Sequence, residues 1–135
     1  MLFRSSREDF FERSDVISLH ILSNDATRGI ITAADLARMK PTALLVNTSR
    51  APIIEDGALV DALKKGRPGF AAVDVYEEEP VIGGNHPLLK LKNALCAPHL
   101  GYSEHGSYEH IYESGVEQLL AYAAGKPIKI GRAHV

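Results

Sequence analysis

The feature that most constrains the fold is a regular alternation of short β-branched runs with amphipathic helical segments. Strands are predicted at 15–20, 43–47, 69–75 and 93–98. Helices are predicted at 32–39, 55–66 and 104–124. Strands that alternate with helices are typical of parallel βαβ units rather than of hairpins. The sequence therefore predicts an α/β fold with about four parallel strands and a long C-terminal helix.

Local signals support the helix boundaries. Thr32 is a candidate N-cap, and Asp35 follows three residues later as the second member of a capping pair. Gly66 stops the second predicted helix, and Gly125 followed by Pro127 stops the last one. These signals separate the predicted helices from the loops that connect them to the strands.

Composition limits the classes of function. The 135 residues with 45% hydrophobic content are enough for one compact domain. The net charge of −2, from 15 basic and 17 acidic residues, gives no electrostatic basis for binding nucleic acid. A single cysteine, Cys96, excludes an internal disulfide and fits a reducing compartment. No stretch reads as a signal peptide or membrane span, so we expect a cytoplasmic protein with no membrane partner.

Polar and charged residues follow three of the predicted strands. Residues 47–50 follow the second strand, 74–79 the third and 98–101 the fourth. In a parallel sheet the carboxyl ends of the strands open onto one edge, where ligands bind. An arginine, several carboxylates and a histidine are therefore expected to share one crevice, and this would explain why four acidic residues crowd into DVYEEEP, 74–80.

These residues also carry a family resemblance. The motifs are NTSR with a following proline and acidic residue (47–55), DVYEEEP, HPLL and APHLGY, preceded by SDVISLH, Thr27 and MKP. In their order and spacing they resemble the D-isomer-specific 2-hydroxyacid dehydrogenases, from Ser14 to Ile128. The resemblance implies the second half of a Rossmann-type NAD-binding domain, which is a doubly wound parallel sheet.

The resemblance also implies a set of site residues. The catalytic residues would be Arg50, Glu79 and His99. The cofactor, NAD or alternatively NADP, would be lined by Ile21, Thr48, Ser49, Arg50, Asp74, His99 and Gly101. Asp74 matches the residue that accepts a hydrogen bond from the nicotinamide carboxamide. No metal site is expected, because no side chains have metal-ligand spacing.

The chemistry implied by the resemblance needs these residue types. Reduction of a 2-oxo acid requires a proton on the carbonyl oxygen as hydride arrives at carbon, and His99 can donate one near neutral pH. Glu79 would orient the imidazole and favour its protonated form. Arg50 would hold the substrate carboxylate with its planar fork of donors.

The remaining histidines and acids have no matched role. They are interpreted as structural or solvated, and comprise His20, His86, His105, His110, His134, Glu77 and Glu78.

Some positions depart from the family pattern. Ala51 stands where glycine is usual, a modest change if its φ stays negative. No two glycines are separated by one residue, so the chain has no G-x-G-x-x-G turn. Residues 1–129 are therefore expected to be the C-terminal part of an NAD-binding domain, without its G-x-G-x-x-G half and without a substrate domain. The segment IGRAHV, 130–135, is expected to be a non-native tail, because its back-translation resembles a sequencing-adapter read-through.

Alternative functions remain open at this point. The leading one is a fragment of an NAD(P)-dependent oxidoreductase that interconverts a 2-hydroxy acid and a 2-oxo acid and is inactive alone. The full-length parent would be a homodimer with a small acid as substrate. The alternative is a non-catalytic NAD(H)-sensing module of the same fold, and a third is a stand-alone domain that binds a protein partner.

Overall fold

The computed structural model describes residues 5–128, so the expected tail at 130–135 lies outside the described residues. The chain divides after Gly101 into two compact units, each described here by itself. The first contains α1 (Arg7–Arg13), β1 (Val16–Leu19), α2 (Ala33–Arg38), β2 (Leu44–Asn47), α3 (Ala58–Lys64), β3 (Phe70–Val73) and β4 (Ala94–Cys96). Short 3₁₀ turns lie at η1 (Ala51–Ile53), η2 (Ile82–Gly84) and η3 (Pro87–Lys90). The second unit contains α4 (His105–Ala123).

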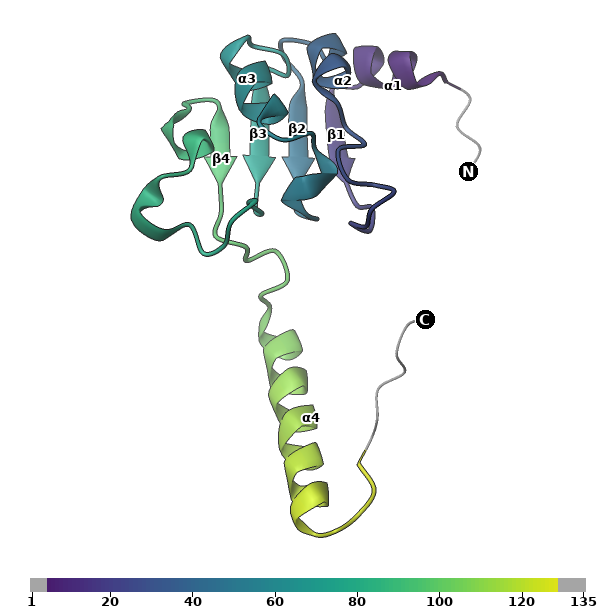
Figure 1. The fold of residues 1–135 in the computed structure, drawn as a ribbon, viewed down its shortest axis with the longest axis vertical. Helices are drawn as coiled ribbons and strands as arrows, with labels where there is room; N and C mark the ends of the chain where they lie inside the picture. Colours follow the sequence, from purple (N-terminus) through teal and green to yellow (C-terminus); the bar gives the residue numbers. More distant parts are fainter. Residues whose placement is uncertain (1–4, 129–135) are drawn as a thin grey trace. The chain divides into compact units, whose positions relative to one another are not determined.

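The four strands form one parallel sheet in the order β1-β2-β3-β4 (Figure 1). The register is in step across the first three strands, with Val16 opposite Leu44 and Leu44 opposite Phe70. All strands point the same way, so their carboxyl ends share one edge. The predicted parallel α/β fold is confirmed, and each strand is shorter than its predicted range.

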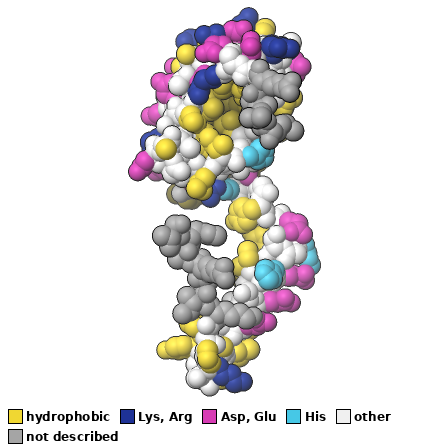
Figure 2. All heavy atoms as spheres, turned by 90° about the vertical axis from the view of Figure 1, so that its right-hand side faces the viewer, with side chains coloured by type: hydrophobic (Ala, Val, Ile, Leu, Met, Phe, Trp, Pro, Cys, Tyr) yellow, Lys and Arg dark blue, Asp and Glu magenta, His cyan; other side chains and the backbone are white. Residues whose placement is uncertain are grey.

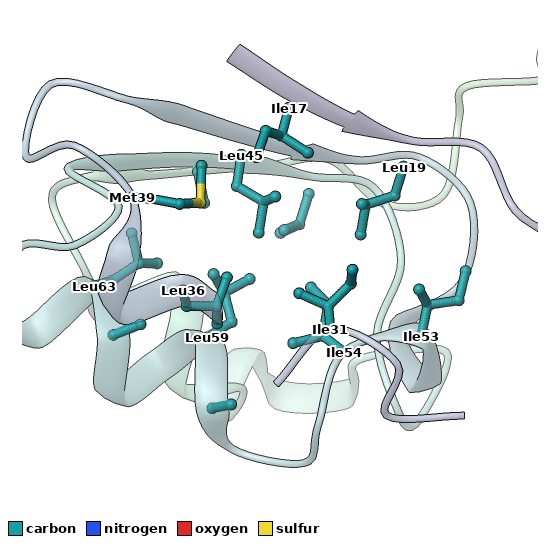
Figure 3. Packing of buried hydrophobic residues seen from close by; sticks show 14 of the residues in the cluster. Ile17, Leu19, Ile31, Leu36, Met39, Leu45, Ile53, Ile54, Leu59 and Leu63 are labelled. Atoms are coloured by element: carbon teal, nitrogen blue, oxygen red, sulfur yellow. The ribbon is translucent and has the colours of Figure 1, made fainter. Parts of the chain in front are cut away.

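The hydrophobic core lies on one face of the sheet. Ile17, Leu19 and Leu45 point from the strands toward Leu36 of α2 and Leu59 of α3 (Figure 3). Side chains alternate along each strand, and this face carries the buried ones. On the opposite face Val16, Phe70 and Leu95 are exposed.

Helix α2 begins with the predicted cap. The Thr32 hydroxyl accepts a hydrogen bond from the Asp35 amide, and the Asp35 carboxylate accepts one from the Thr32 amide. Asp35 also pairs with Arg7 of α1, a helix that the sequence analysis did not predict. The capping residue therefore also links α1 to α2.

Helix α4, in the second unit, is capped by the Glu104 carboxylate, which accepts hydrogen bonds from the amides of Gly106 and Ser107. It ends before Gly125, whose φ is +63°. Glutamates recur every fourth residue at Glu109, Glu113 and Glu117, so they lie along one side of the helix. Figure 2 shows acidic side chains along one side of the helix, whereas acidic and basic side chains mix on the first unit.

Candidate active site

The loops that follow β2, β3 and β4 meet at the carboxyl edge of the sheet. The Asp74 amide donates to the Asn47 carbonyl (3.0 Å), and the Ala97 amide donates to the Val73 carbonyl (2.9 Å). These bonds continue the sheet by one residue past the strand ends. The side chains that follow these strands therefore lie together at the carboxyl edge of the sheet, as the order of the strands predicts.

Glu79 and His99 form the central side-chain pair of this edge. Oε2 of Glu79 lies 2.6 Å from Nδ1 of His99, and Oε1 accepts the Tyr76 amide at 2.8 Å. Both side chains of the pair are about one-third exposed, at 32% and 31%. His99 has φ +57° and is the non-glycine residue with positive φ among residues 5–128. Such a conformation is uncommon for a residue with a Cβ and is characteristic of functional sites.

The electrostatic surroundings favour the ionised form of Glu79. Burial raises the pKa of the Glu79 carboxyl, but hydrogen bonds from His99 and the Tyr76 amide, together with the charges of His99 and Arg50, lower it more. The net pKa lies below the ordinary value of glutamic acid. The Glu79 carboxylate can therefore accept a hydrogen bond from a protonated Nδ1 of His99.

Asp74 is the buried carboxylate of the site, at 5% exposure. Its Oδ1 accepts the Leu100 amide at 2.8 Å and its Oδ2 accepts the Gly101 amide at 2.6 Å. A Cβ at Gly101 would lie 2.9 Å from Oδ2 of Asp74 and 3.9 Å from Cβ of Thr48. Only glycine fits this approach without a shift, and so Asp74, Gly101 and Thr48 are brought together.

The loop after β2 is organised by buried Asn47. Its Nδ2 donates to the Arg50 carbonyl (3.0 Å), and its Oδ1 accepts the Ser49 amide (3.1 Å). The Ser49 hydroxyl donates to the Ile21 carbonyl (2.8 Å), which joins this loop to the end of β1. The Arg50 guanidinium is exposed and donates to the Ser49 carbonyl (2.7 Å). Ala51 belongs to η1 and is not among the positive-φ residues, so the expected tolerance of Ala51 agrees with the backbone.

Other side chains, Tyr76, Glu77 and His86, take part in the architecture of the site although the sequence analysis gave them no such role. The Tyr76 hydroxyl donates to the Ala97 carbonyl at 2.9 Å, and Nε2 of His86 lies 2.8 Å from Oε2 of Glu77. Burial, and then the neighbouring Cys96, raises the pKa of the Tyr76 hydroxyl. The interpretation of Glu77 as simply solvent-facing is incomplete, since it binds a histidine. The HPLL motif was the available signal, because it places His86 directly before η3.

Within residues 5–128, no cluster of three or more His, Cys, Asp or Glu side chains is placed to hold a metal ion. None of the helices described is both long and apolar enough to cross a membrane.

The sequence profile of the D-isomer specific 2-hydroxyacid dehydrogenase, NAD binding domain, matches residues 3–101. The chain belongs to this family. The match covers the sheet and every residue of the site described above. NAD, the cofactor implied by the resemblance, is the one that the family's name specifies.

Individual relatives agree with the family assignment. The chain is 43% identical to a glyoxylate reductase of Aeropyrum pernix, over 90% of this chain and 36% of that protein. It is 41% identical to a glyoxylate reductase of Thermococcus litoralis, over 88% of this chain and 35% of that protein. A phosphoglycerate oxidoreductase from Vibrio cholerae o395 has a similar crystal structure, with a TM-score of 0.82 and 50% identity, over 90% of this chain and 38% of that one. The chain therefore spans little more than a third of the length of these relatives.

Proposed function

We propose that this chain is part of an NAD-dependent oxidoreductase that interconverts a 2-hydroxy acid and a 2-oxo acid by hydride transfer. The observation that carries the proposal is the Glu79–His99 pair, 2.6 Å apart, at the carboxyl edge of a family NAD-binding sheet. A carboxylate that accepts a hydrogen bond from one nitrogen of an imidazole fixes the orientation of the ring, which suits a side chain that exchanges a proton with substrate.

The proton chemistry follows from the orientation of the His99 ring. With Nδ1 donating to Glu79, the proton for the reaction is held at Nε2, and the carboxylate stabilises the imidazolium form. Nε2 would donate this proton to the carbonyl oxygen of a 2-oxo acid during reduction and take it back during oxidation. Bound NADH supplies the hydride in the first direction.

Substrate and cofactor binding are assigned to the loops beside this pair. Arg50 would hold the substrate carboxylate, because its guanidinium offers paired donors in one plane. Asp74 fits the nicotinamide carboxamide, since each carboxylate oxygen can accept more than the one backbone bond it has here. The absence of a side chain at Gly101 lets its backbone approach Asp74 and Thr48 closely, which keeps these three residues together on the proposed nicotinamide side. Ile21 and Ser49 would line the same cofactor.

The substrate class rests on the relatives. Those named above are glyoxylate reductases and a phosphoglycerate oxidoreductase, whose names point to small oxo or hydroxy acids. A small 2-oxo acid is therefore the proposed substrate. A cytoplasmic homodimer is the proposed state of the full-length protein, on the basis of the family resemblance and the single cysteine.

The decisive test is His99→Ala in the longer protein that contains this chain. We expect kcat for reduction of glyoxylate or another 2-oxo acid to fall by roughly 10²-fold or more, as for loss of a positioned acid. His110→Ala is the matched control, because His110 is exposed on α4 and should leave kcat unchanged. Full activity of His99→Ala would refute the assignment. NADH binding without turnover of any 2-oxo acid by the unaltered protein would favour the non-catalytic NAD(H)-sensing module.

A further inference from the structure

His86 is a nearly buried histidine outside the Glu79–His99 pair. Its side chain is 14% exposed, and it is the N-cap of η3, where Nδ1 accepts the Leu88 amide at 3.3 Å. Leu88 is itself 5% exposed and belongs to the hydrophobic core. The ring of His86 is therefore fixed to the core on one side. Because Nδ1 accepts a hydrogen bond, the ring proton is on Nε2.

The other side of the ring holds the loop that follows β3. Nε2 lies 2.8 Å from Oε2 of Glu77, so its proton is donated to that carboxylate. The ring also packs edge-on against Tyr76, with centroids 5.0 Å apart and planes at 67°. Edge-to-face contacts of this kind are favourable beyond the area they bury. One imidazole thus fixes two consecutive residues, Tyr76 and Glu77.

Those two residues lead directly to the proposed catalytic pair. The Tyr76 amide donates to Oε1 of Glu79, which is the oxygen that does not face His99. The Tyr76 hydroxyl donates to the carbonyl of Ala97, two residues before His99. A shift of Tyr76 would therefore move both members of the pair relative to each other.

We propose that His86 is a positioning residue which, through Tyr76 and Glu77, holds the Glu79 carboxylate against His99. The importance of this for catalysis rests on the proposed function above. The positioning itself is a property of the 135-residue chain and can be measured without turnover. If His86 served only as the N-cap of η3, loss of the contact between its Nε2 and Glu77 would leave the Glu79–His99 pair unchanged.

Two substitutions separate the capping role from the positioning role. His86→Asn keeps an acceptor close to the place of Nδ1 and is a good N-cap, but it cannot reach Glu77 or pack against Tyr76. His86→Gln places an amide donor near the position of Nε2 and can keep the Glu77 contact, but it is a poorer cap. Asn and Gln are both uncharged amides, so the two variants are compared with each other at equal charge.

The readout is the pKa of Glu79, followed by carboxyl-carbon NMR in the 135-residue chain, together with thermal unfolding. In the unaltered chain the hydrogen bond with His99 helps to keep this pKa below the ordinary value. We expect His86→Asn to raise the pKa of Glu79 toward the ordinary value, and His86→Gln to restore most of the wild-type behaviour. The opposite order, or a wild-type pKa in His86→Asn, would show that His86 is only a cap and would overturn the proposal.

Glu77→Ala provides a second route if His86→Asn does not fold. It removes the acceptor and leaves the cap of η3 intact. Loss of a nearby negative charge would by itself lower the pKa of Glu79, so a rise can come only from a loosened Glu79–His99 contact. A fall or no change overturns the proposal.

In the longer, active protein, His86→Asn should lower kcat by about tenfold or more with little change in KM, because a displaced acid slows chemistry rather than binding. A drop in kcat that His86→Gln does not rescue contradicts positioning. If the pKa of Glu79 responds as expected but the longer protein turns over no 2-oxo acid, the positioning holds and the proposed function fails.

Discussion

Gly101 is the residue whose substitution most directly tests the packing of the site. A Cβ there would lie 2.9 Å from Oδ2 of Asp74, closer than real Cβ atoms come to other heavy atoms. We expect Gly101→Ala to push Asp74 away from the amides of Leu100 and Gly101 and to cost about 1–3 kcal/mol of stability, as measured by urea unfolding. Gly115→Ala in α4 is the control, since nothing lies within 4 Å of its added Cβ. Equal stability of the two variants would contradict the close approach.

At the scale of residues, the sequence predicts where a side chain lies when its position follows directly from a strand end. Arg50, Asp74, Glu79 and His99 were all indicated by their places after β2, β3 and β4, and the acidic cluster proved to be a set of differently bonded carboxylates. Contacts that depend on the path of a loop could not be predicted. His86 reaches Glu77 only because residues 77–86 fold back, and no periodicity encodes that path.

At the scale of elements, the contact between α1 and α2 makes the first unit sensitive to acid. The hydrogen bond from Arg7 lowers the pKa of Asp35 to about 2, with further bonds from Thr32, although burial opposes the shift. Because the folded chain binds this proton less readily than the unfolded chain, the stabilisation is complete above about pH 4. It is lost as the pH falls through about 2.

Substitution of Asp35 should therefore act mainly at neutral pH. Asp35→Asn removes the ion pair and weakens the capping box, and we expect a loss of about 1–3 kcal/mol at pH 7. Thermal unfolding between pH 7 and pH 2 should show the difference from wild type shrinking with acid. Asp61→Asn is the control, since its pair with Lys64 is exposed and 3.7 Å long. A difference that stays constant down to pH 2 would exclude Asp35 as the titrating group.

The elements themselves were predictable to different degrees, for identifiable reasons. The strands are predicted by β-branched runs, and α2, α3 and α4 by helical periodicity and capping signals such as Thr32. Helix α1 has only seven residues, buries Phe11 and is capped by Ser6, which accepts the Asp9 amide. So short a helix is marginal without tertiary contacts, and its pairing through Arg7 and Asp35 could not be inferred from local sequence.

At the scale of the whole molecule, the sheet is covered by the helices of its unit on one face only. Val16 is 60% exposed, Phe70 53% and Leu95 73% on the other face. Parallel sheets are usually covered on both faces, so these residues mark a surface suited to further layers of structure. This agrees with a chain that spans about a third of the length of its relatives.

The residues that the 135-residue chain contains also predict how tightly it binds NADH by itself. Thr48, Asp74 and Gly101 are the residues proposed for the nicotinamide end. No two glycines of the chain are separated by one residue, so no G-x-G-x-x-G turn is present to bind the pyrophosphate. The pyrophosphate is the charged part of NADH, and a helix N-terminus is its usual partner. We therefore expect isothermal calorimetry to give a Kd for NADH above about 1 mM, which corresponds to less than roughly 4 kcal/mol of binding free energy. We also expect no turnover of 2-oxo acids by this chain. A chain extended by a G-x-G-x-x-G half is the control and should bind far more tightly. Micromolar affinity in the 135-residue chain would show that the carboxyl edge of this sheet suffices for the cofactor.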